Sequence, residues 1–325
     1  MSDARLPRIG ATAISRRDAL THIAGAAALA ARPARTLAQV RAASGGGAHR
    51  RSSAFIPASD PRLTFEGRTA PGPDGSRRIG FPGVVLRFRT DGARVTAHLT
   101  ASSDDVYVDL TVAGAPARRI RLTRGAQEVV LHAGAAEPRT IALLKRTESW
   151  QGTLEIAGVQ VDSGAVAPVS LPDRRLVFIG DSITCGSSSD VPDASSTEDG
   201  AQTNDGAKSF GRVLAARLGA ACHLVGYGGR GVIRDWQGIR DIANAPVFYE
   251  RAMPDEPAAL WDHRAFVPHA VGICLGTNDF NQGVPDQNEF VNAYVDFVRK
   301  VLRDAPGAVL FVIDSPMTAD SVALG

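Results

Sequence analysis

Between about residues 60 and 163, apolar and polar residues alternate along a series of short segments. Residues 84–89 and 106–112 show this period of two, and Gly, Asp and Pro residues separate the segments. A period of two places successive side chains on opposite faces of a strand, so that one face can pack on a core. Several short strands of this kind are typical of an antiparallel β-sandwich. We therefore expect a β-sandwich domain over residues 60–165.

A different pattern begins after residue 172. Continuous apolar runs, as at 176–179 and 270–275, alternate with segments that carry apolar residues at helical spacing, as at 210–218 and 290–302. Buried strands that alternate with amphipathic helices favour right-handed βαβ units and a parallel sheet. We expect an α/β domain with a flavodoxin-like parallel sheet and flanking helices over residues 172–325. The segment has four strand candidates where a fifth strand and a closing helix are expected, so we expect this domain to be C-terminally incomplete.

The N-terminal segment has its own composition. Arg16 and Arg17 precede a short apolar stretch at 23–31, and alanine-rich sequence follows. This order is typical of a twin-arginine export signal over residues 1–38, and a basic tail without structure is the alternative. Residues 39–59 include three successive glycines and are expected to be a linker. We therefore expect an exported protein, either secreted or periplasmic.

Composition and charge argue against several functional classes. The chain has 36 Lys and Arg residues against 34 Asp and Glu residues, so its net charge of +2 gives no electrostatic case for nucleic acid as a partner. No apolar run reaches the roughly 18 residues that indicate a membrane span. The cysteines Cys185, Cys222 and Cys274 have the spacing of neither a disulfide framework nor a metal site. We expect no metal and no organic cofactor.

Three predicted strands each end in a turn with one chemically useful group. The first turn carries Ser182, the glycine-rich turn 226–231 carries Gly229, and the third carries Asn278. The carboxyl ends of parallel strands share one edge of a sheet, and open α/β sheets bind ligands there. Acyl transfer needs a nucleophile and hydrogen-bond donors for the oxyanion that forms. Each group alone is more often part of an ordinary turn, but their order and placement together favour a catalytic site.

These blocks resemble the SGNH, or GDSL-type, hydrolases, and most closely carbohydrate esterase family 2. The similarity lies in GDSITCG at 180–186, GGRGVIRDW at 228–236, LGTNDF at 275–280 and LLKRTESWQG at 143–152. The last block is similar to the end of the family's N-terminal β-domain, and the resemblance covers roughly residues 60 to 320. It implies a jelly-roll-like sandwich before an SGNH hydrolase domain. It also implies a serine esterase that removes O-acetyl groups from polysaccharides or oligosaccharides of the xylan or mannan type through an acetyl-enzyme.

The resemblance also implies roles for single residues. Ser182 becomes the nucleophile, and Gly229 and Asn278 become oxyanion donors together with the N–H of Ser182. Trp236 matches a position where the family commonly carries an aromatic side chain near the sugar, although a lone Trp is more often a core residue. Arg230 and Asp279 are interpreted as structural, the first as a solvated turn charge and the second as a carboxylate that caps a turn.

One element of the family's pattern is missing from the sequence. Family members carry a catalytic histidine in a loop near the C-terminus, often with an aspartate three residues before it, but no histidine follows Asn278. Without a general base a serine is a poor nucleophile. We therefore expect this sequence to be a fragment of a longer esterase. The alternatives are a non-catalytic carbohydrate-binding protein and a lipase-like or aryl esterase of the wider SGNH group.

Several properties stay open at this stage. The sequence does not identify the sugar, the hydroxyl position that carries the acetyl group, or the oligomeric state. It also leaves open whether the esterase uses a Ser-His dyad or a Ser-His-Asp triad, and where the signal is cleaved. The β-sandwich can bind carbohydrate or act only as a packing partner of the hydrolase domain.

Overall fold

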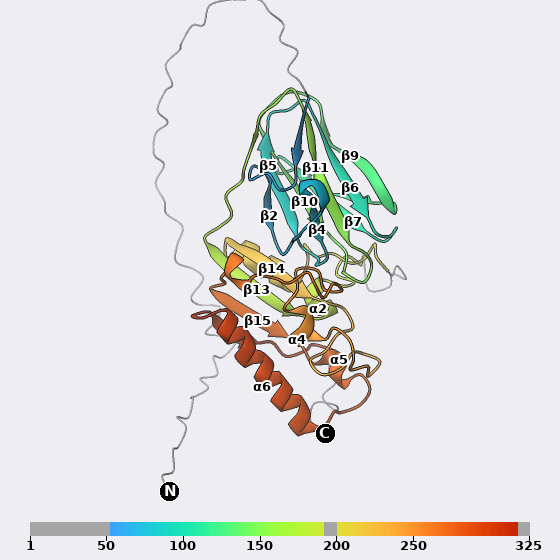
Figure 1. Ribbon diagram of the computed structural model, residues 1–325, viewed down its shortest axis with the longest axis vertical. Coiled ribbons are helices and arrows are strands. Elements are labelled where there is room, and N and C mark those ends of the chain that lie inside the picture. The colour runs from blue at the N-terminus through green and yellow to red at the C-terminus, as the bar shows by residue number, and fades with distance from the viewer. Residues whose placement is uncertain (1–52, 192–199, 318–325) are drawn as a thin grey trace, which may run out of the picture. The chain divides into compact units, whose positions relative to one another are not determined.

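The computed structural model describes residues 53–191 and 200–317, in which a β-sandwich precedes a parallel α/β domain (Figure 1). This order of an antiparallel β-domain and an α/β domain with a parallel sheet confirms the predicted fold class. The predicted export signal at 1–38 and the first part of the predicted linker lie outside the described residues. Among the described residues, no helix is long and apolar enough to cross a membrane.

The sandwich consists of two antiparallel sheets. One has the strand order β3-β4-β11-β6-β9 with β1 also beside β11, and the other has the order β12-β5-β10-β7-β8 with β2 also beside β5. The strands are β1 (Ala54–Pro57), β2 (Thr64–Glu66), β3 (Ala70–Pro71), β4 (Arg77–Ile79), β5 (Val85–Thr90), β6 (Arg94–Ala101), β7 (Tyr107–Val112), β8 (Arg118–Arg121), β9 (Gly125–Ala133), β10 (Arg139–Lys145), β11 (Leu154–Asp162) and β12 (Val166–Ala167). A short 3₁₀ helix, Pro73–Gly75, lies between β3 and β4.

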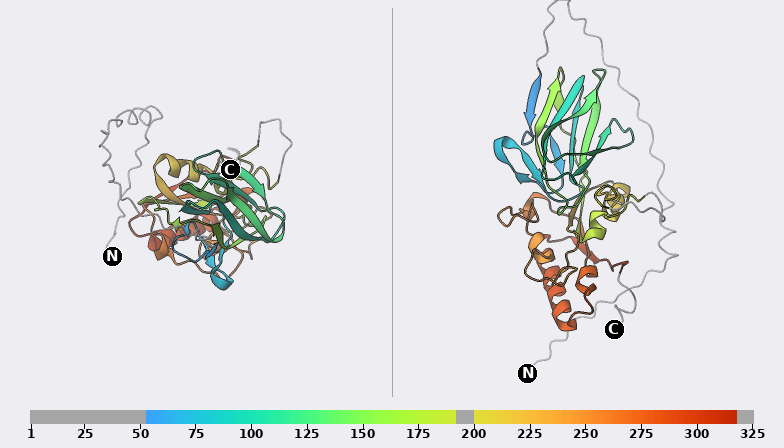
Figure 2. Two further views of the ribbon diagram at one scale, coloured as in Figure 1. Left: turned by 90° about the horizontal axis from the view of Figure 1, so that it is seen from above. Right: turned by 90° about the vertical axis from the view of Figure 1, so that its right-hand side faces the viewer.

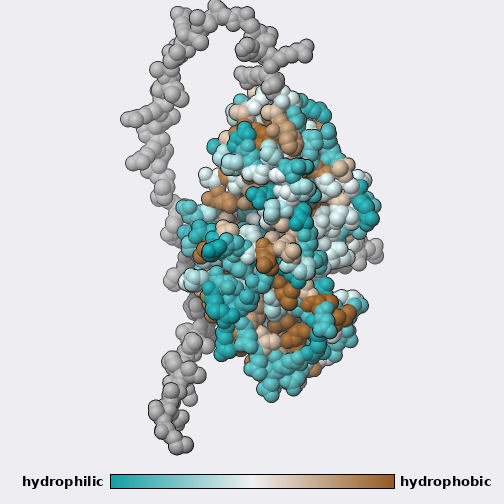
Figure 3. All heavy atoms as spheres, in the orientation of Figure 1, coloured by the Kyte–Doolittle hydropathy of each residue, from teal (hydrophilic) through white to brown (hydrophobic). Residues whose placement is uncertain are grey.

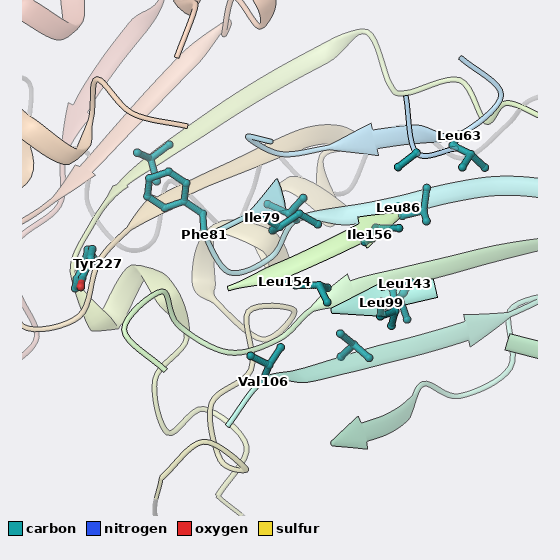
Figure 4. Packing of buried hydrophobic residues seen from close by; sticks show 14 of the residues in the cluster. Leu63, Ile79, Phe81, Leu86, Leu99, Val106, Leu143, Leu154, Ile156 and Tyr227 are labelled. Carbon is teal, nitrogen blue, oxygen red and sulfur yellow. The ribbon is translucent and has the colours of Figure 1, made fainter. Parts of the chain in front are cut away.

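The alternation seen in the sequence decides which side chains enter the core of the sandwich. In β5 the side chains of Leu86 and Phe88 are buried, whereas Arg89 is exposed. Antiparallel pairing places Leu86 opposite Leu143 of β10. Figure 4 shows Leu86, Leu143 and Leu99 among the buried apolar residues of this core. The period of two thus translates directly into one apolar face for each sheet.

Two short strands correct the predicted domain boundaries. β1 pairs with β11 although it lies within residues 39–59, which were expected to be a linker. β12 pairs with β5 although it lies beyond residue 165. The sandwich therefore extends past both ends of the predicted range. Segments of two to four residues are too short to show a period, and pairing with a long neighbouring strand gives them their extended conformation.

The second domain contains a four-stranded parallel sheet of order β14-β13-β15-β16. Its strands are β13 (Arg174–Gly180), β14 (Ala220–Gly226), β15 (Ala270–Cys274) and β16 (Val309–Val312). The helices are α2 (Ser182–Cys185), α3 (Phe210–Arg217), α4 (Ala245–Phe248), η2 (His263–Ala265), α5 (Thr277–Phe280) and α6 (Gln287–Asp304). Because β13 lies between β14 and β15, the chain leaves it toward one side and later crosses to the other. The carboxyl end of β13 is therefore a topological switch point, where open α/β sheets bind ligands.

Helices cover both faces of this sheet. Figures 1 and 2 show the long helix α6 beside it. Phe178 of β13 packs in the cluster that includes Ala215 of α3. Its neighbour Ile179 belongs to the cluster that includes Phe297 of α6. Burial on both faces explains the continuous apolar run of β13, because successive side chains alternate between two cores.

Ionic contacts join the sandwich to the α/β domain. The Glu66 carboxylate of β2 accepts hydrogen bonds from the N–H of Cys222 at 2.8 Å and from Arg212 at 2.6 Å. Arg146, directly after β10, donates to Asp109 and to Asp205, each at 2.9 Å. Asp205 follows Ser182 in the chain, so the sandwich holds part of the loop behind the nucleophile turn.

The surface mixes hydrophilic and hydrophobic residues on the face drawn in Figure 3. Isolated apolar residues on a surface are common and need no special explanation. Two exposed aromatic side chains are relevant below: Trp150 is 59% exposed and Trp236 is 50% exposed. The three cysteines are buried and free.

Candidate active site

Ser182 lies at the first position of α2, directly after β13. The Asp181 side chain caps this short helix, because its Oδ1 accepts a hydrogen bond from the N–H of Ile183 at 3.0 Å. Gly186 ends the helix in the left-handed conformation, with a φ of 79°. The turn therefore presents Ser182 at the carboxyl edge of the parallel sheet, directly after the strand predicted from the apolar run 176–179.

A cavity of about 520 Å³ opens at Ser182. Three predicted site residues, Ser182, Gly229 and Trp236, line it together, whereas Asn278 does not. The lining residues are Glu148, Trp150, Ser182, Ser187, Tyr227, Gly228, Gly229, Arg230, Asp235, Trp236 and Gln237. The cavity is therefore built by the nucleophile turn, the turn after β14 and a loop of the sandwich.

The two glycines of the turn after β14 are needed for different reasons. Gly229 has a φ of 77°, a left-handed conformation that side chains with a Cβ rarely adopt, and an added Cβ would lie 2.8 Å from Cδ1 of Trp236. Gly228 has ordinary backbone angles, but an added Cβ would collide with the Glu148 carboxylate. The turn can therefore pass close to both Trp236 and Glu148 only because glycine occupies positions 228 and 229.

The backbone donors expected for the oxyanion are available in this turn and at the nucleophile. Among the described residues, no acceptor lies within hydrogen-bond distance and angle of the N–H groups of Ser182 and Gly229. Both groups belong to residues that line the same cavity. Unpaired N–H groups beside a nucleophile are what an oxyanion hole requires.

Asn278 lies between the nucleophile turn and the glycine turn. It follows β15 in α5 and is 8% exposed. Its Nδ2 donates to the carbonyl of Arg230 at 3.0 Å and more weakly to Oδ2 of Asp181 at 3.3 Å. The carboxamide thus ties the two loops together. The oxyanion role of Asn278 stays a prediction, because it requires the N–H that now faces Asp181 to donate to the bound substrate.

The electrostatics of this edge are dominated by buried carboxyl groups. Burial raises the pKa of Asp181 to about 6, although the N–H of Ile183 and the hydroxyl of Thr277 act against this shift. Burial also raises the pKa of Asp279, whose carboxylate accepts hydrogen bonds from the N–H groups of Val232 and Ile233. A raised pKa means that the folded state favours the protonated form of the carboxyl group over the ionised form.

A pH-dependent stability follows from Asp181. Between about pH 4 and pH 6 the unfolded chain loses this proton before the folded chain does, so the free energy of unfolding falls as the pH rises. The full cost at pH 7 is about 3 kcal/mol. Replacing Asp181 by Asn removes the titration but keeps a capping oxygen. Urea unfolding should therefore show that the variant gains about 3 kcal/mol relative to the parent between pH 4 and pH 7. Parallel pH curves for the two proteins would exclude this titration.

The histidines among the described residues lie away from the cavity at Ser182. His223 stacks on Phe266 with 3.6 Å between ring centroids, and His263 lines a different cavity with it. The Nδ1 of His269 accepts from the N–H of Arg175 at the opposite end of the sheet. His98 and His132 belong to the sandwich, and His22 and His49 lie outside the described residues. No described histidine is therefore assigned as the general base.

The predictions for Asp279 and Arg230, the two residues interpreted as structural, compare differently with the structure. Asp279 holds the backbone of residues 232–234, which confirms its role as a capping carboxylate. Arg230 was expected to be solvated, but its side chain is only 19% exposed and its guanidinium lies 4.8 Å from the centre of the Tyr227 ring. Packing on this ring explains the difference, because the flat guanidinium can stack on an aromatic face.

Glu148 and Trp150 are cavity residues that sequence reasoning did not identify. Both lie in the loop after β10, and Trp150 is exposed whereas Glu148 is 1% exposed. The block 143–152 resembles the end of the family's β-domain, but no periodicity connects a sandwich loop with a site in another domain. The tertiary structure alone brings these side chains to Ser182.

One group of possible metal ligands lies elsewhere. The ligand atoms of Glu250, His263 and Asp304 are within 4.8 Å of one another. The ammonium group of Lys300 lies 2.7 Å from Glu250 and already supplies a positive charge there. Since none of these residues lines the cavity at Ser182, we assign this group no part in the site.

Comparisons with protein families match both domains. The family model described as "Carbohydrate esterase 2 N-terminal" matches residues 65–169. The model of the GDSL-like lipase/acylhydrolase family matches residues 178–323. The two matches meet close to the boundary between the sandwich and the parallel sheet.

Comparisons with single proteins agree with the two family models. The chain is 33% identical over 266 residues to an acetylxylan esterase/glucomannan deacetylase of Cellvibrio japonicus (strain Ueda107), covering 81% of this chain and 74% of that protein. It resembles the solved structure of a family two carbohydrate esterase from Cellvibrio japonicus with a TM-score of 0.79 and 32% identity, covering 84% of this chain and 82% of that one. A family two carbohydrate esterase from Clostridium thermocellum, solved in complex with cellohexaose, has a TM-score of 0.75 and 25% identity, covering 81% and 80% of the two chains.

Proposed function

The chain belongs to carbohydrate esterase family 2, and from this premise we propose that it is a serine esterase that removes O-acetyl groups from polysaccharide. The observation that carries the proposal is the single cavity lined by Ser182 and Gly229. Both residues line this cavity, and no acceptor among the described residues pairs with their backbone N–H groups. These are the groups that formation of an acyl-enzyme requires.

The proposed reaction has two halves. The Ser182 oxygen forms a bond to the ester carbonyl carbon, and the carbonyl oxygen takes the negative charge. The serine proton passes to a general base, which none of the described histidines supplies. The N–H groups of Ser182 and Gly229 and the Asn278 amide stabilise that oxyanion. The bond between the carbonyl carbon and the sugar oxygen then breaks. The sugar oxygen takes up the proton and the sugar leaves, while the acetyl group stays on Ser182 as an ester. Water hydrolyses this ester to acetate and restores the hydroxyl.

The proposed substrate is an acetylated polysaccharide of the xylan or mannan type. The Cellvibrio japonicus relative is named for acetylxylan and glucomannan. In this chain the half-exposed indole of Trp150 lies beside Gly228 and that of Trp236 beside Gly229. Exposed aromatic rings beside a cavity offer flat apolar surfaces, which suit the faces of sugar rings.

Trp236 should therefore affect sugar binding more than chemistry. Replacing it by alanine is expected to raise KM for acetylated xylo-oligosaccharides about tenfold, since the loss of one aromatic contact is worth about 1.4 kcal/mol. The KM for 4-nitrophenyl acetate, which has no sugar ring, should change by less than about twofold. Initial-rate kinetics on both substrates test this role. Equal changes in KM for the two esters would show that Trp236 does not contact the sugar.

The direct test of the proposed function is the release of acetate from acetylated xylan and acetylated glucomannan by the full chain. Acetate can be quantified by an enzyme-coupled assay. Saturable binding of the polysaccharide without acetate release would instead support a non-catalytic carbohydrate-binding protein. Faster turnover of long-chain esters than of acetylated sugars would support a lipase-like esterase.

We also infer that the protein is exported through the twin-arginine route. Arg16 and Arg17 before a short apolar stretch support this inference. Replacing both arginines by lysine is expected to retain the protein in the cytoplasm of the producing bacterium, because the pathway recognises the paired arginines. Fractionation with an antibody measures the outcome, and unchanged export of the variant would contradict it.

A further inference from the structure

Glu148 is a buried carboxylate that the sandwich places in the wall of the cavity at Ser182. It is 1% exposed and lies in the loop directly after β10. Burial raises its pKa, against the effect of the Ser187 hydroxyl, the Trp150 indole, the Cys185 thiol and the N–H of Gly228 nearby. Ser187 and Cys185 belong to the nucleophile turn, so one side of Glu148 faces the segment that carries Ser182.

The other side of Glu148 faces the glycine turn. Its Oε2 approaches Gly228 so closely that a Cβ at this position would collide with the carboxylate. Gly228 directly precedes Gly229, whose N–H is an expected oxyanion donor. Among the described residues, Oε2 of Glu148 has no hydrogen-bond partner of good geometry. A buried carboxylate oxygen without such a partner costs free energy, so stability alone does not explain its position beside Gly228.

The loop that carries Glu148 is itself fixed. The buried ammonium group of Lys145 donates to the carbonyls of Thr147 at 2.6 Å and Glu148 at 3.2 Å. The N–H of Glu148 donates to Oε1 of Gln151 at 2.9 Å, and the same oxygen accepts from Asn204 at 2.9 Å. Asn204 belongs to the loop after the nucleophile turn. The Glu148 side chain therefore projects from a rigid support toward both catalytic turns.

We propose that Glu148 is a positioning residue that sets the separation between the nucleophile turn and the Gly228–Gly229 turn. It acts on the reaction through Gly229, and it makes the sandwich a part of the esterase site. This inference rests on the proposed function for its effect on turnover. The effect of Glu148 on the Gly228–Gly229 turn can be measured even if the protein releases no acetate.

The experiment compares Glu148→Ala and Glu148→Gln with a matched control, Glu66→Gln. Glu66 is also a buried carboxylate that the sandwich directs to the α/β domain, but it contacts Arg212 and Cys222 and does not line the cavity. Each full-length variant is first checked by its thermal unfolding. Amide hydrogen exchange over residues 226–231 and the kinetics of acetate release are then measured.

For Glu148→Ala we expect amide exchange at Gly228 and Gly229 to become at least about tenfold faster, which corresponds to a loss of about 1.4 kcal/mol of local stability. We expect kcat for acetate release to fall about 10- to 100-fold and KM to change less than about twofold, because the oxyanion donor is misplaced while the sugar contacts remain. Glu148→Gln, which keeps the volume and one acceptor oxygen, should recover most of both losses.

The control separates positioning from general stability. Glu66→Gln is expected to lower the unfolding temperature while the exchange of the glycine turn and kcat stay near the parent values. The proposal is overturned if Glu148→Ala leaves exchange at 226–231 unchanged, or if Glu66→Gln changes exchange and kcat equally. If the parent protein releases no acetate, the proposed function fails for this chain, and the exchange data still decide the role of Glu148.

Discussion

Replacing Ser182 by alanine is expected to lower the rate of acetate release from acetylated xylan by about 10⁴- to 10⁶-fold. The alanine variant has no oxygen that can attack the ester carbon, so the acetyl-enzyme cannot form. What remains is the rate that the oxyanion donors and substrate binding provide without a nucleophile. Because Ser182 is only partly buried and lies in a turn at the edge of the sheet, the thermal unfolding temperature should change little.

The measurement compares initial rates of acetate release from equal amounts of the two proteins. Ser102→Ala is a suitable control, since Ser102 is an exposed serine of the sandwich. It should release acetate at the parent rate. Binding of deacetylated oligosaccharide to Ser182→Ala should also stay at the parent level. An alanine variant that keeps more than about one per cent of parent turnover would remove Ser182 from the role of nucleophile.

Replacing Asn278 by alanine is expected to lower kcat by about 100- to 1000-fold, the usual cost of one oxyanion donor. The KM should rise much less, because the donor acts on charge that develops in the transition state. The structure adds a second consequence. Asn278 also bridges Arg230 and Asp181, so the variant should lose some stability by leaving the Arg230 carbonyl without this donor.

The two consequences can be separated by comparing kinetics with unfolding. Steady-state kinetics on an acetylated xylo-oligosaccharide give kcat and KM, and urea unfolding gives the free energy. Asn288→Ala, at an exposed position of α6, is the matched control and should leave both unchanged. A loss of stability with kcat within about threefold of the parent would show that Asn278 only ties the two loops together.

Much of the fold could be predicted because the relevant signals are local. The period of two in β5 shows directly which side chains face a core, and burial on both faces makes the apolar run of β13 continuous. The end of β13 also predicted the position of Ser182, since parallel sheets expose the carboxyl ends of their strands at one edge. These inferences needed only the order of residues within one segment.

Other features could not be predicted because they depend on contacts between distant segments. β1 is extended only because it pairs with β11, about a hundred residues later. Arg230 is partly covered by Tyr227 and paired at 3.8 Å with Asp235. The bonds of Asn278 to Asp181 and Arg230 join three strand ends, and no single strand end contains that information.

Local patterns of residues were therefore enough to predict the two domains, the serine at the strand end and the family that these blocks resemble, because periodicity and short motifs are properties of neighbouring residues. That the sandwich contributes to the site emerged from the packing of the folded chain. Glu148 and Gly228 lie eighty positions apart, and their close approach depends on the packing of two domains that share one core cluster. Side-chain contacts across such a separation are fixed by three-dimensional packing, which no local pattern of residues encodes.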